Sequence, residues 1–191
     1  MSLDVRALLE ETGALLTGHF RLSSGLHSAN YVQCALLLEN PAHAKAIGAA
    51  LADHLRGLDV QRIVAPALGG VIIGYTVAEA LEVPFVFTER KEGAMTLRRG
   101  FRLREGERIV IVEDVVTTGK STRETADVIA QHGGNVVGFA SILNRSGNAN
   151  PFAPADYHAL LALDFETHEE KACPLCARGV ALDAPGSRYS K

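Results

Sequence analysis

Residues 108–121 decide the fold, and they read Arg108-Ile109-Val110-Ile111-Val112-Glu113-Asp114-Val115-Val116-Thr117-Thr118-Gly119-Lys120-Ser121. The continuous apolar run at the start is typical of a central strand in a parallel sheet, because such a strand is buried on both faces. Two adjacent carboxylates follow the run, and a turn of small residues then leads directly into a helix. The stretch therefore predicts a buried strand that delivers polar groups to one edge of a sheet.

The turn at residues 117–119 has the composition of an anion site. Backbone N–H groups of such a turn and of the following helix N-terminus form a concave site for a negative charge, and the neighbouring hydroxyl groups add donors. Gly119 lets the backbone approach an anion closely because it has no Cβ. Glu113 and Asp114 would repel an anion if they pointed at it, so we expect them to face sugar hydroxyls or a magnesium ion.

Strands and helices alternate along the rest of the chain. We expect helices at residues 5–16, 41–57, 70–82 and 120–132, and strands at residues 60–64, 83–87, 108–112, 135–139 and 158–163. A Ser-Ser-Gly turn between two β-prone runs predicts a hairpin within residues 20–34, and the polar residues 90–100 suit a mobile loop. This alternation predicts an α/β fold with a parallel sheet and helices on both faces. Ligands of such sheets bind at the carboxyl ends of the strands.

The bulk composition favours one globular domain and excludes several classes of protein. The chain has 191 residues, of which 47% are hydrophobic and 21% are charged. A formal charge of −3 argues against a nucleic-acid partner, which usually requires a strongly basic domain. Charged residues interrupt the N-terminal region, and no apolar stretch approaches the roughly 20 residues of a membrane helix. We therefore expect a cytoplasmic protein with no membrane partner.

Residues 109–121 resemble the phosphoribosyl-pyrophosphate motif of the type I phosphoribosyltransferases along their whole length. They do not have the spacing of a Walker phosphate loop. The resemblance implies a central, mainly parallel sheet flanked by helices, with a small N-terminal hood. It also implies that phosphoribosyl pyrophosphate is bound by Glu113, Asp114, Val115, Val116, Thr117, Thr118, Gly119, Lys120 and Ser121.

Three further segments are similar to the orotate phosphoribosyltransferase family. Residues 20–28 resemble its hood, although many members have a lysine where Ser23 stands and an aromatic pair at residues 31–32. Residues 66–70 resemble its pyrophosphate loop, where a lysine often stands in place of Gly69. Residues 141–147 resemble the segment that carries its orotate-binding arginine. The resemblance implies that Thr117 and Arg145 bind orotate, whose carboxylate a guanidinium can bind with two parallel hydrogen bonds.

The segment 90–100 matches the position of the catalytic loop of this family. It begins Arg90-Lys91-Glu92, as expected, but Ala94 and Thr96 stand near the places of a second lysine and a histidine. Lys91 is therefore the first candidate for the catalytic cation, with Arg98 and Arg99 as alternatives. The resemblance implies that Arg90 and Lys91 contact phosphoribosyl pyrophosphate, and that the loop closes over the reaction as a lid.

The resemblance also implies a reaction. The 5-phosphoribosyl group of phosphoribosyl pyrophosphate would pass to orotate, giving orotidine 5′-phosphate and pyrophosphate in pyrimidine biosynthesis. Lys91, Glu113 and Asp114 would be the catalytic residues, and Mg²⁺ would be held mainly by the pyrophosphate of the substrate. Residues 1–191 would form one domain, with a hood at about 1–38 plus the C-terminal segment and a core at about 39–165. The family's loop reaches into a neighbouring subunit, which implies a homodimer with shared sites.

Two alternatives and one motif remain beside this hypothesis. A purine phosphoribosyltransferase would share residues 113–121, and a regulatory protein could bind phosphoribosyl pyrophosphate without chemistry. Cys173-Pro174-Leu175-Cys176 is a CxxC pair, but a zinc site needs about four ligands, and His168 or His158 would not complete the set. We favour a structural turn there over a metal or redox role.

Overall fold

The computed structural model describes residues 3–22 and 24–185 and contains two sheets. The larger is six-stranded, in the order β5-β4-β3-β6-β7-β8, and all neighbouring strands are parallel except the β4–β5 pair. Its strands are β3 (Arg62–Pro66), β4 (Phe85–Lys91), β5 (Ala94–Leu97), β6 (Arg108–Val116), β7 (Asn135–Asn144) and β8 (Tyr157–Ala162). The predicted fold class, an α/β fold with a mainly parallel central sheet, is confirmed.

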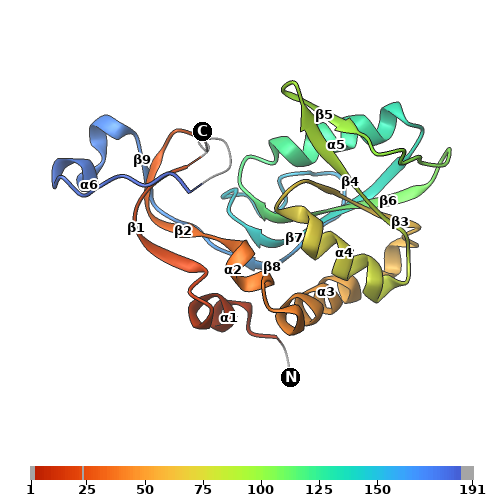
Figure 1. The fold of residues 1–191 in the computed structure, drawn as a ribbon, viewed down its shortest axis with the longest axis horizontal. Coiled ribbons are helices and arrows are strands. Elements are labelled where there is room, and N and C mark those ends of the chain that lie inside the picture. Colours follow the sequence, from red (N-terminus) through yellow and green to blue (C-terminus); the bar gives the residue numbers. More distant parts are fainter. Residues whose placement is uncertain (1–2, 23, 186–191) are drawn as a thin grey trace.

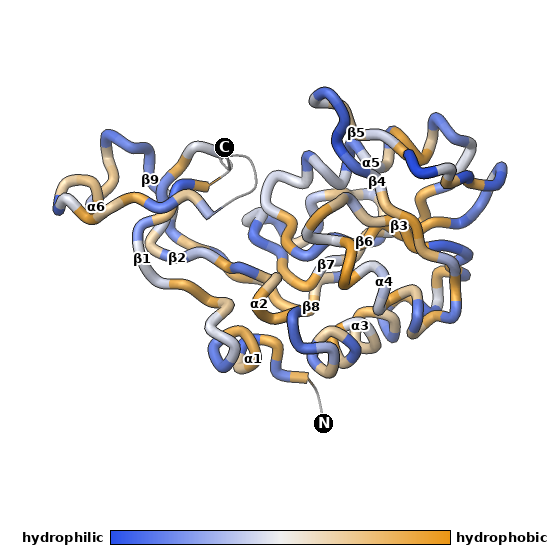
Figure 2. The backbone as a smooth tube through the Cα atoms, viewed as in Figure 1, coloured by the Kyte–Doolittle hydropathy of each residue, from blue (hydrophilic) through white to orange (hydrophobic). Residues whose placement is uncertain are grey.

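Helices cover both faces of the large sheet (Figure 1). Alternate residues of its central strands enter two separate hydrophobic cores, because successive strand residues point to opposite faces. Val110 and Val112 of β6 pack in one core with α3 (Pro41–Leu55) and α4 (Gly70–Leu81). Ile109 and Ile111 pack in the other with α5 (Lys120–Gln131). Figure 2 shows the resulting concentration of hydrophobic residues along β3 and β6.

The smaller sheet forms the hood, which lies beside the large sheet in Figure 1. It has the order β1-β2-β9 and is antiparallel, with β1 at Leu15–Arg21, β2 at His27–Val32 and β9 at Thr167–His168. The first and last parts of the chain therefore share one sheet. The short elements around it are α1 (Val5–Glu11), α2 (Cys34–Leu38), η1 (Arg56–Leu58), η2 (Glu170–Ala172) and α6 (Pro174–Ala177).

Several predicted boundaries were wrong, each for a local reason. The first helix ends at Glu11 instead of residue 16, because Gly13 adopts a left-handed φ of 66° and Leu15 begins a strand. Residues 34–38 form α2 instead of extending the hairpin strand. The strands β6 and β7 extend to residues 116 and 144, so the acidic pair lies within β6 and not after it.

The predicted loop at residues 90–100 is largely a β-hairpin. Strands β4 and β5 pair from Thr88↔Leu97 to Lys91↔Ala94 around a two-residue turn. Glu92 and Gly93 both have positive φ angles, 52° and 85°, which is the conformation that closes a tight hairpin. The polar composition that suggested a loop reflects exposure of this hairpin. Among the described residues, no helix is long and apolar enough to cross a membrane.

Candidate active site at the carboxyl ends of the strands

A cavity of about 570 Å³ lies where β3 and β6 end. Core residues that line it are Ala67, Leu68, Gly69, Ile72, Glu113, Asp114, Val115, Val116, Thr117, Thr118, Gly119, Lys120, Ser121 and Thr122. Hood and neighbouring residues complete the lining with Tyr31, Gln33, Ala35, Leu38 and Pro185. The whole predicted stretch 113–121 therefore borders one cavity, as the carboxyl-end rule for parallel sheets predicts. No sequence motif marks three of these lining residues, which are Gln33, Ala35 and Pro185. The packing of the hood against the core brings them to the cavity.

The turn after β6 presents its backbone to this cavity. Gly119 has a φ of 69° and is the N-cap residue of α5, where it has no side chain to cap the helix. Oγ1 of Thr118 accepts from the N–H of Lys120 at 3.3 Å. A Cβ on Gly119 would lie 2.9 Å from Nη1 of Arg123 and from the ring of Phe152, so the position requires glycine. Arg123 donates from Nη1 to the Thr118 carbonyl at 2.7 Å and fixes the turn from outside. The backbone N–H groups of the first helical turn are thus held in place for an anion.

Glu113, which is buried, and Asp114, which is half-buried, form an acidic pair in the cavity wall. Glu113 is 9% exposed, and the backbone N–H of Val115 donates to Oδ1 of Asp114 at 2.8 Å. Burial raises the pKa of Glu113 well above its ordinary value, and the adjacent charge of Asp114 raises it further. Burial also raises the pKa of Asp114. Two neighbouring carboxyls of this kind titrate as a pair.

The pyrophosphate-loop segment runs close to this pair. Ala67, Leu68 and Gly69 line the cavity, and the Ala67–Leu68 peptide bond is cis. A Cβ on Gly69 would lie 2.5 Å from Oδ2 of Asp114. Glycine at this position therefore allows the loop to approach Asp114 closely. A larger residue at position 69 would fit only if the acidic pair or the loop moved.

Arg145 follows β7 and lies next to the end of β6. Its backbone N–H donates to the carbonyl of Val116 at 2.7 Å, and its guanidinium lies over the ring of Phe165 at 4.4 Å. Burial lowers the pKa of Arg145, with opposing effects from Tyr31 and Asp164. Nε of Arg145 is buried, and no hydrogen-bond partner for it is found in the described part of the chain. A partly buried guanidinium with an unsatisfied donor is suited to an anionic ligand.

The predicted hairpin cations do not border the cavity. Arg90 pairs with Glu124, while Arg98 and Arg99 pair with Glu89 at 3.4 and 3.0 Å. For Lys91 no ion pair is found among residues 3–22 and 24–185, and its side chain is exposed. None of these four cations lines the cavity of its own chain. Their predicted roles in binding and catalysis therefore receive no support from the cavity of a single chain.

Comparisons with known proteins agree with one another. Residues 35–158 match the family model described as "Phosphoribosyl transferase domain". The orotate phosphoribosyltransferase of Thermotoga maritima is 46% identical over 187 residues, which cover 98% of this chain and 100% of that protein. Its counterpart from Carboxydothermus hydrogenoformans is 46% identical over 188 residues, covering 97% of this chain and 98% of that protein. The crystal structure of orotate phosphoribosyltransferase from Aeropyrum pernix superposes with a TM-score of 0.68 at 22% identity, covering 84% and 94% of the two chains, which shows the shared fold.

Proposed function

This chain belongs to the orotate phosphoribosyltransferases, within the phosphoribosyl transferase domain family, and we propose that the cavity beside β6 is its active site. The protein transfers the 5-phosphoribosyl group of phosphoribosyl pyrophosphate to orotate in pyrimidine biosynthesis. The products are orotidine 5′-phosphate and pyrophosphate.

The observation that carries the site assignment is the position of Arg145. Nε of Arg145 is buried without a partner in the described part of the chain, and the backbone N–H of Arg145 donates to the carbonyl of Val116 at the end of β6. Arg145 itself is not among the residues that line the cavity, but it interacts electrostatically with Tyr31, which does line it. Orotate differs from uracil by a carboxylate, which needs a cation with two parallel donors. The presence of Arg145 close to residues 113–121 therefore favours orotate over a purine base as the acceptor.

Phosphoribosyl pyrophosphate fits the rest of the cavity. The amides and hydroxyls of residues 117–121, which line the cavity, would hold the 5′-phosphate, since a helix N-terminus attracts anions. Glu113 and Asp114 would accept hydrogen bonds from the ribose 2′- and 3′-hydroxyls. Val115 and Val116 line the same wall, and Thr117 would contact the base beside Arg145.

Oxygen donors in the wall are compatible with Mg²⁺. Carboxylate and hydroxyl oxygens are the ligands that this ion prefers, and Glu113, Asp114 and Thr117 provide them. We assign the ion mainly to the pyrophosphate of the substrate, where it would neutralise charge on the leaving group.

Catalysis by these residues is mostly electrostatic and positional. Arg145 and Thr117 would orient the ring nitrogen of orotate towards the anomeric carbon, on the face opposite the departing pyrophosphate. The acidic pair would stabilise positive charge on the ribose ring as the bond between the anomeric carbon and the pyrophosphate oxygen breaks and the bond to the ring nitrogen of orotate forms. Lys91 would stabilise negative charge on the leaving pyrophosphate, and closure of the hairpin would exclude water from the reactive ribose.

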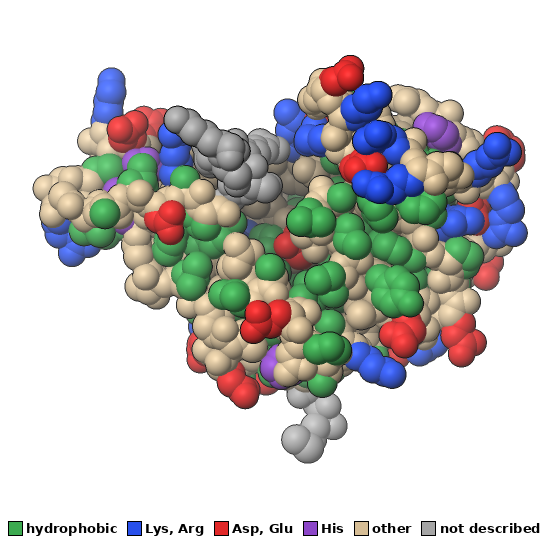
Figure 3. All heavy atoms as spheres, in the orientation of Figure 1, with side chains coloured by type: hydrophobic (Ala, Val, Ile, Leu, Met, Phe, Trp, Pro, Cys, Tyr) green, Lys and Arg blue, Asp and Glu red, His purple; other side chains and the backbone are tan. Residues whose placement is uncertain are grey.

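A homodimer would bring Lys91 to a cavity. Leu68, Ile72 and Tyr75 are exposed by 84%, 47% and 60%, which is unusual for large apolar side chains that lie together on one helix and the turn before it. Figure 3 shows hydrophobic side chains gathered on the face over α4. We assign this surface to contact with a second copy, whose hairpin would supply Lys91. We further propose a cytoplasmic location and a single domain in which the hood, residues 1–38 with the C-terminal segment, covers the core at 39–165.

Substrate specificity tests the site assignment. Purified protein is assayed with phosphoribosyl pyrophosphate and magnesium against orotate, uracil, hypoxanthine, guanine and adenine, and we expect turnover of orotate alone. Arg145→Ala should lower kcat/KM for orotate by about 10²-fold, the equivalent of a lost charged hydrogen bond. The affinity for phosphoribosyl pyrophosphate should remain unchanged. Turnover of a purine, or binding of phosphoribosyl pyrophosphate without turnover of any base, would contradict the assignment.

Subunit mixing tests the shared site. Lys91→Ala and Arg145→Ala are each expected to be nearly inactive alone. Mixed dimers would contain one site with both residues intact, so unfolding and refolding the variants together should restore about a quarter of the wild-type activity. Recovery should be absent when Arg145→Ala is mixed with itself. Failure of the mixed sample to regain activity, with dimers verified by light scattering, would exclude sharing of Lys91.

A further inference from the structure

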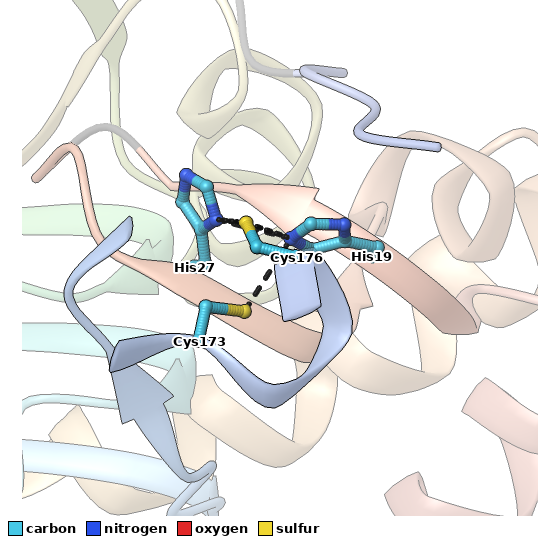
Figure 4. Close-up of side chains that lie close together, drawn as sticks. All are labelled: His19, His27, Cys173 and Cys176. Atoms are coloured by element: carbon cyan, nitrogen blue, oxygen red, sulfur yellow. Dashed lines mark hydrogen bonds between the residues drawn. The ribbon is translucent and has the colours of Figure 1, made fainter. Parts of the chain in front are cut away.

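Two histidines of the hood and the two C-terminal cysteines meet in one cluster (Figure 4). His19 lies in β1, and His27 is the first residue of β2. Cys173 immediately precedes the short helix α6, and Cys176 lies within it. Their side chains point towards one another, and the four potential ligand atoms all lie within 4.8 Å of one another. This cluster belongs to the hood, and none of its members lines the active-site cavity.

The distances match the edges of a small tetrahedron. Nε2 of His19 lies 3.0 Å from Nδ1 of His27, and the Sγ atoms of Cys173 and Cys176 lie 3.5 and 3.6 Å from Nε2 of His19. Sγ of Cys176 lies 3.2 Å from Nδ1 of His27. Zinc bonds of about 2.0–2.1 Å to nitrogen and about 2.3 Å to sulfur imply tetrahedral edges of roughly 3.3–3.8 Å. These four distances lie within a few tenths of an ångström of such edges, and the other two, from Sγ of Cys173 to Sγ of Cys176 and to Nδ1 of His27, are at most 4.8 Å.

Hydrogen bonding prepares His19 to act as a ligand. Nδ1 of His19 lies 2.8 Å from the carbonyl oxygen of Val180, to which it can only donate. The proton of the neutral ring is then on Nδ1, and the lone pair of Nε2 points into the cluster. A single lone pair cannot accept from three neighbours at once, whereas it can bind one central cation. A backbone carbonyl bound to the second ring nitrogen is the usual outer partner of a metal-binding histidine.

We propose that His19, His27, Cys173 and Cys176 bind one Zn²⁺ ion. Thiolate sulfur and imidazole nitrogen in tetrahedral arrangement select zinc over the oxygen-preferring magnesium and calcium ions. Two thiolates and two neutral imidazoles balance the charge of the ion, with release of the two thiol protons. A neutral site suits this location, where His19, His27 and Cys173 are exposed by 3% or less. Four protein ligands leave no open position, so the ion is structural.

The ligands come from distant parts of the sequence, which explains why the CxxC motif alone gave no metal prediction. His19 and Cys173 are separated by 154 positions. The two histidines considered from the sequence lie elsewhere: His168 pairs with Glu166 at 3.6 Å, and His158 stacks on His54. The residues that complete the set are brought in by the pairing of β1 with β2 and by the return of the chain through β9.

The ion would fasten the C-terminal segment to the hood. Beyond the cluster the chain runs along β1, where Asp183 donates its N–H to the carbonyl of His19 at 2.8 Å and accepts from the N–H of Arg21 at 2.8 Å. Two residues later, Pro185 lines the active-site cavity. Zinc therefore positions one wall of the cavity from a distance, without contacting a substrate.

Metal analysis of the full-length protein tests this proposal independently of enzyme activity. The protein is purified under reducing conditions, dialysed against zinc, freed of loosely bound ions and analysed by plasma mass spectrometry. We expect one zinc per chain. Cys176→Ser and His27→Ala should each weaken zinc binding, measured against a chromophoric chelator, by more than about 100-fold. The matched controls His168→Gln and His158→Gln should retain the wild-type stoichiometry and affinity.

Cobalt binding to the wild-type protein provides a second test, and its result does not depend on whether the variants fold. Wild-type apoprotein titrated with Co²⁺ should develop the intense visible absorption of tetrahedral cobalt, with a thiolate charge-transfer band, and saturate at one equivalent. Zinc should then displace the cobalt. Absence of both zinc and the cobalt spectrum would overturn the proposal, as would a Cys173–Cys176 disulfide that survives in the reduced preparation.

Discussion

Glu107 is the most completely enclosed carboxylate that pairs with arginine in the described structure. Its side chain is fully buried and accepts hydrogen bonds from Nε of Arg62 at 3.0 Å and from Arg104 at 2.9–3.1 Å. It lies just before β6 and joins this strand to β3. Burial alone would raise the pKa of Glu107, but the hydrogen bonds from Arg62 and Arg104 outweigh it and lower the pKa.

Replacing Glu107 by Gln should therefore lower the free energy of unfolding at pH 7 by about 2–3 kcal/mol, because two guanidinium groups lose their charged acceptor. A folded-state pKa below the unfolded value, which is about 4.3, contributes stability above that value and loses it as the pH falls. Urea melts at several pH values should thus show the wild-type advantage shrinking below about pH 4. Glu10→Gln, in an exposed pair with Arg6, should change stability by less than about 1 kcal/mol. An equal loss in both variants would contradict this account.

Groups of residues that act together were predictable from the sequence where all their members lie within one continuous segment. The anion turn at 117–119 and the acidic pair needed only the order of residues, and all of them border the cavity. The surroundings of Arg145 and the partners of Cys173 were not predictable, because those contacts join segments far apart in the chain. Burial of Glu107 likewise follows from how β3 and β6 pair, which no local pattern encodes.

Helices α3 and α4 pack closely at one small residue. A Cβ on Gly48 would lie 2.5 Å from Oγ1 and 2.8 Å from the backbone carbonyl carbon of Thr76, so the helices would have to separate. Gly48→Ala should lower the free energy of unfolding by about 1–2 kcal/mol, since the overpacking cost exceeds the gain in helix propensity. Thermal denaturation with circular dichroism provides the measurement.

Gly57→Ala is the matched control for this contact. No heavy atom lies within 4 Å of a Cβ at Gly57, and its φ lies outside the left-handed region. This variant should be neutral or more stable by up to about 1 kcal/mol. A stability for Gly48→Ala at or above that of Gly57→Ala would exclude the proposed close packing.

Elements were predicted well in type and poorly in extent. The hydrophobic run at 109–112 identified β6, but its continuation to Val116 depends on pairing with β7, in which Val116 lies opposite Asn144. The same pairing extends β7 beyond residue 139. The β4–β5 hairpin was missed because its charged residues conceal the alternation of a strand, and the structure reveals it through the pairing of β4 with β5 and the positive φ angles of the turn.

At the scale of the whole molecule, the cavity joins the hood to the core. Tyr31, Gln33 and Pro185 contribute from one side and residues 113–122 from the other. A ligand that binds only the folded protein at 100 times its Kd adds about 2.7 kcal/mol of stability. For a chain of this size, that corresponds to a rise in Tm of about 5–10 °C.

Magnesium phosphoribosyl pyrophosphate should therefore produce a shift of this size in differential scanning fluorimetry. Arg145→Ala should keep the shift but lose any further rise caused by an unreactive orotate analogue, because Arg145 is assigned to the base alone. Thr118→Pro, which distorts the anion turn, should abolish the first shift. An unchanged Tm at high ligand concentration would mean that the folded protein does not bind magnesium phosphoribosyl pyrophosphate, and would contradict the assignment of this cavity.

The hood is built from the two ends of the chain, and this affects the order in which the protein can form during translation. Strands β1 and β2 leave the ribosome before the central sheet, whereas β9 and α6 follow them by well over a hundred residues. An isolated two-stranded hairpin is only marginally stable in water. Strands β1 and β2 therefore remain incompletely folded while the central sheet assembles. Closure over so long a separation is also entropically slow. Synthesis that stopped at residue 166 would thus leave an ordered core bearing an unfinished, aggregation-prone edge.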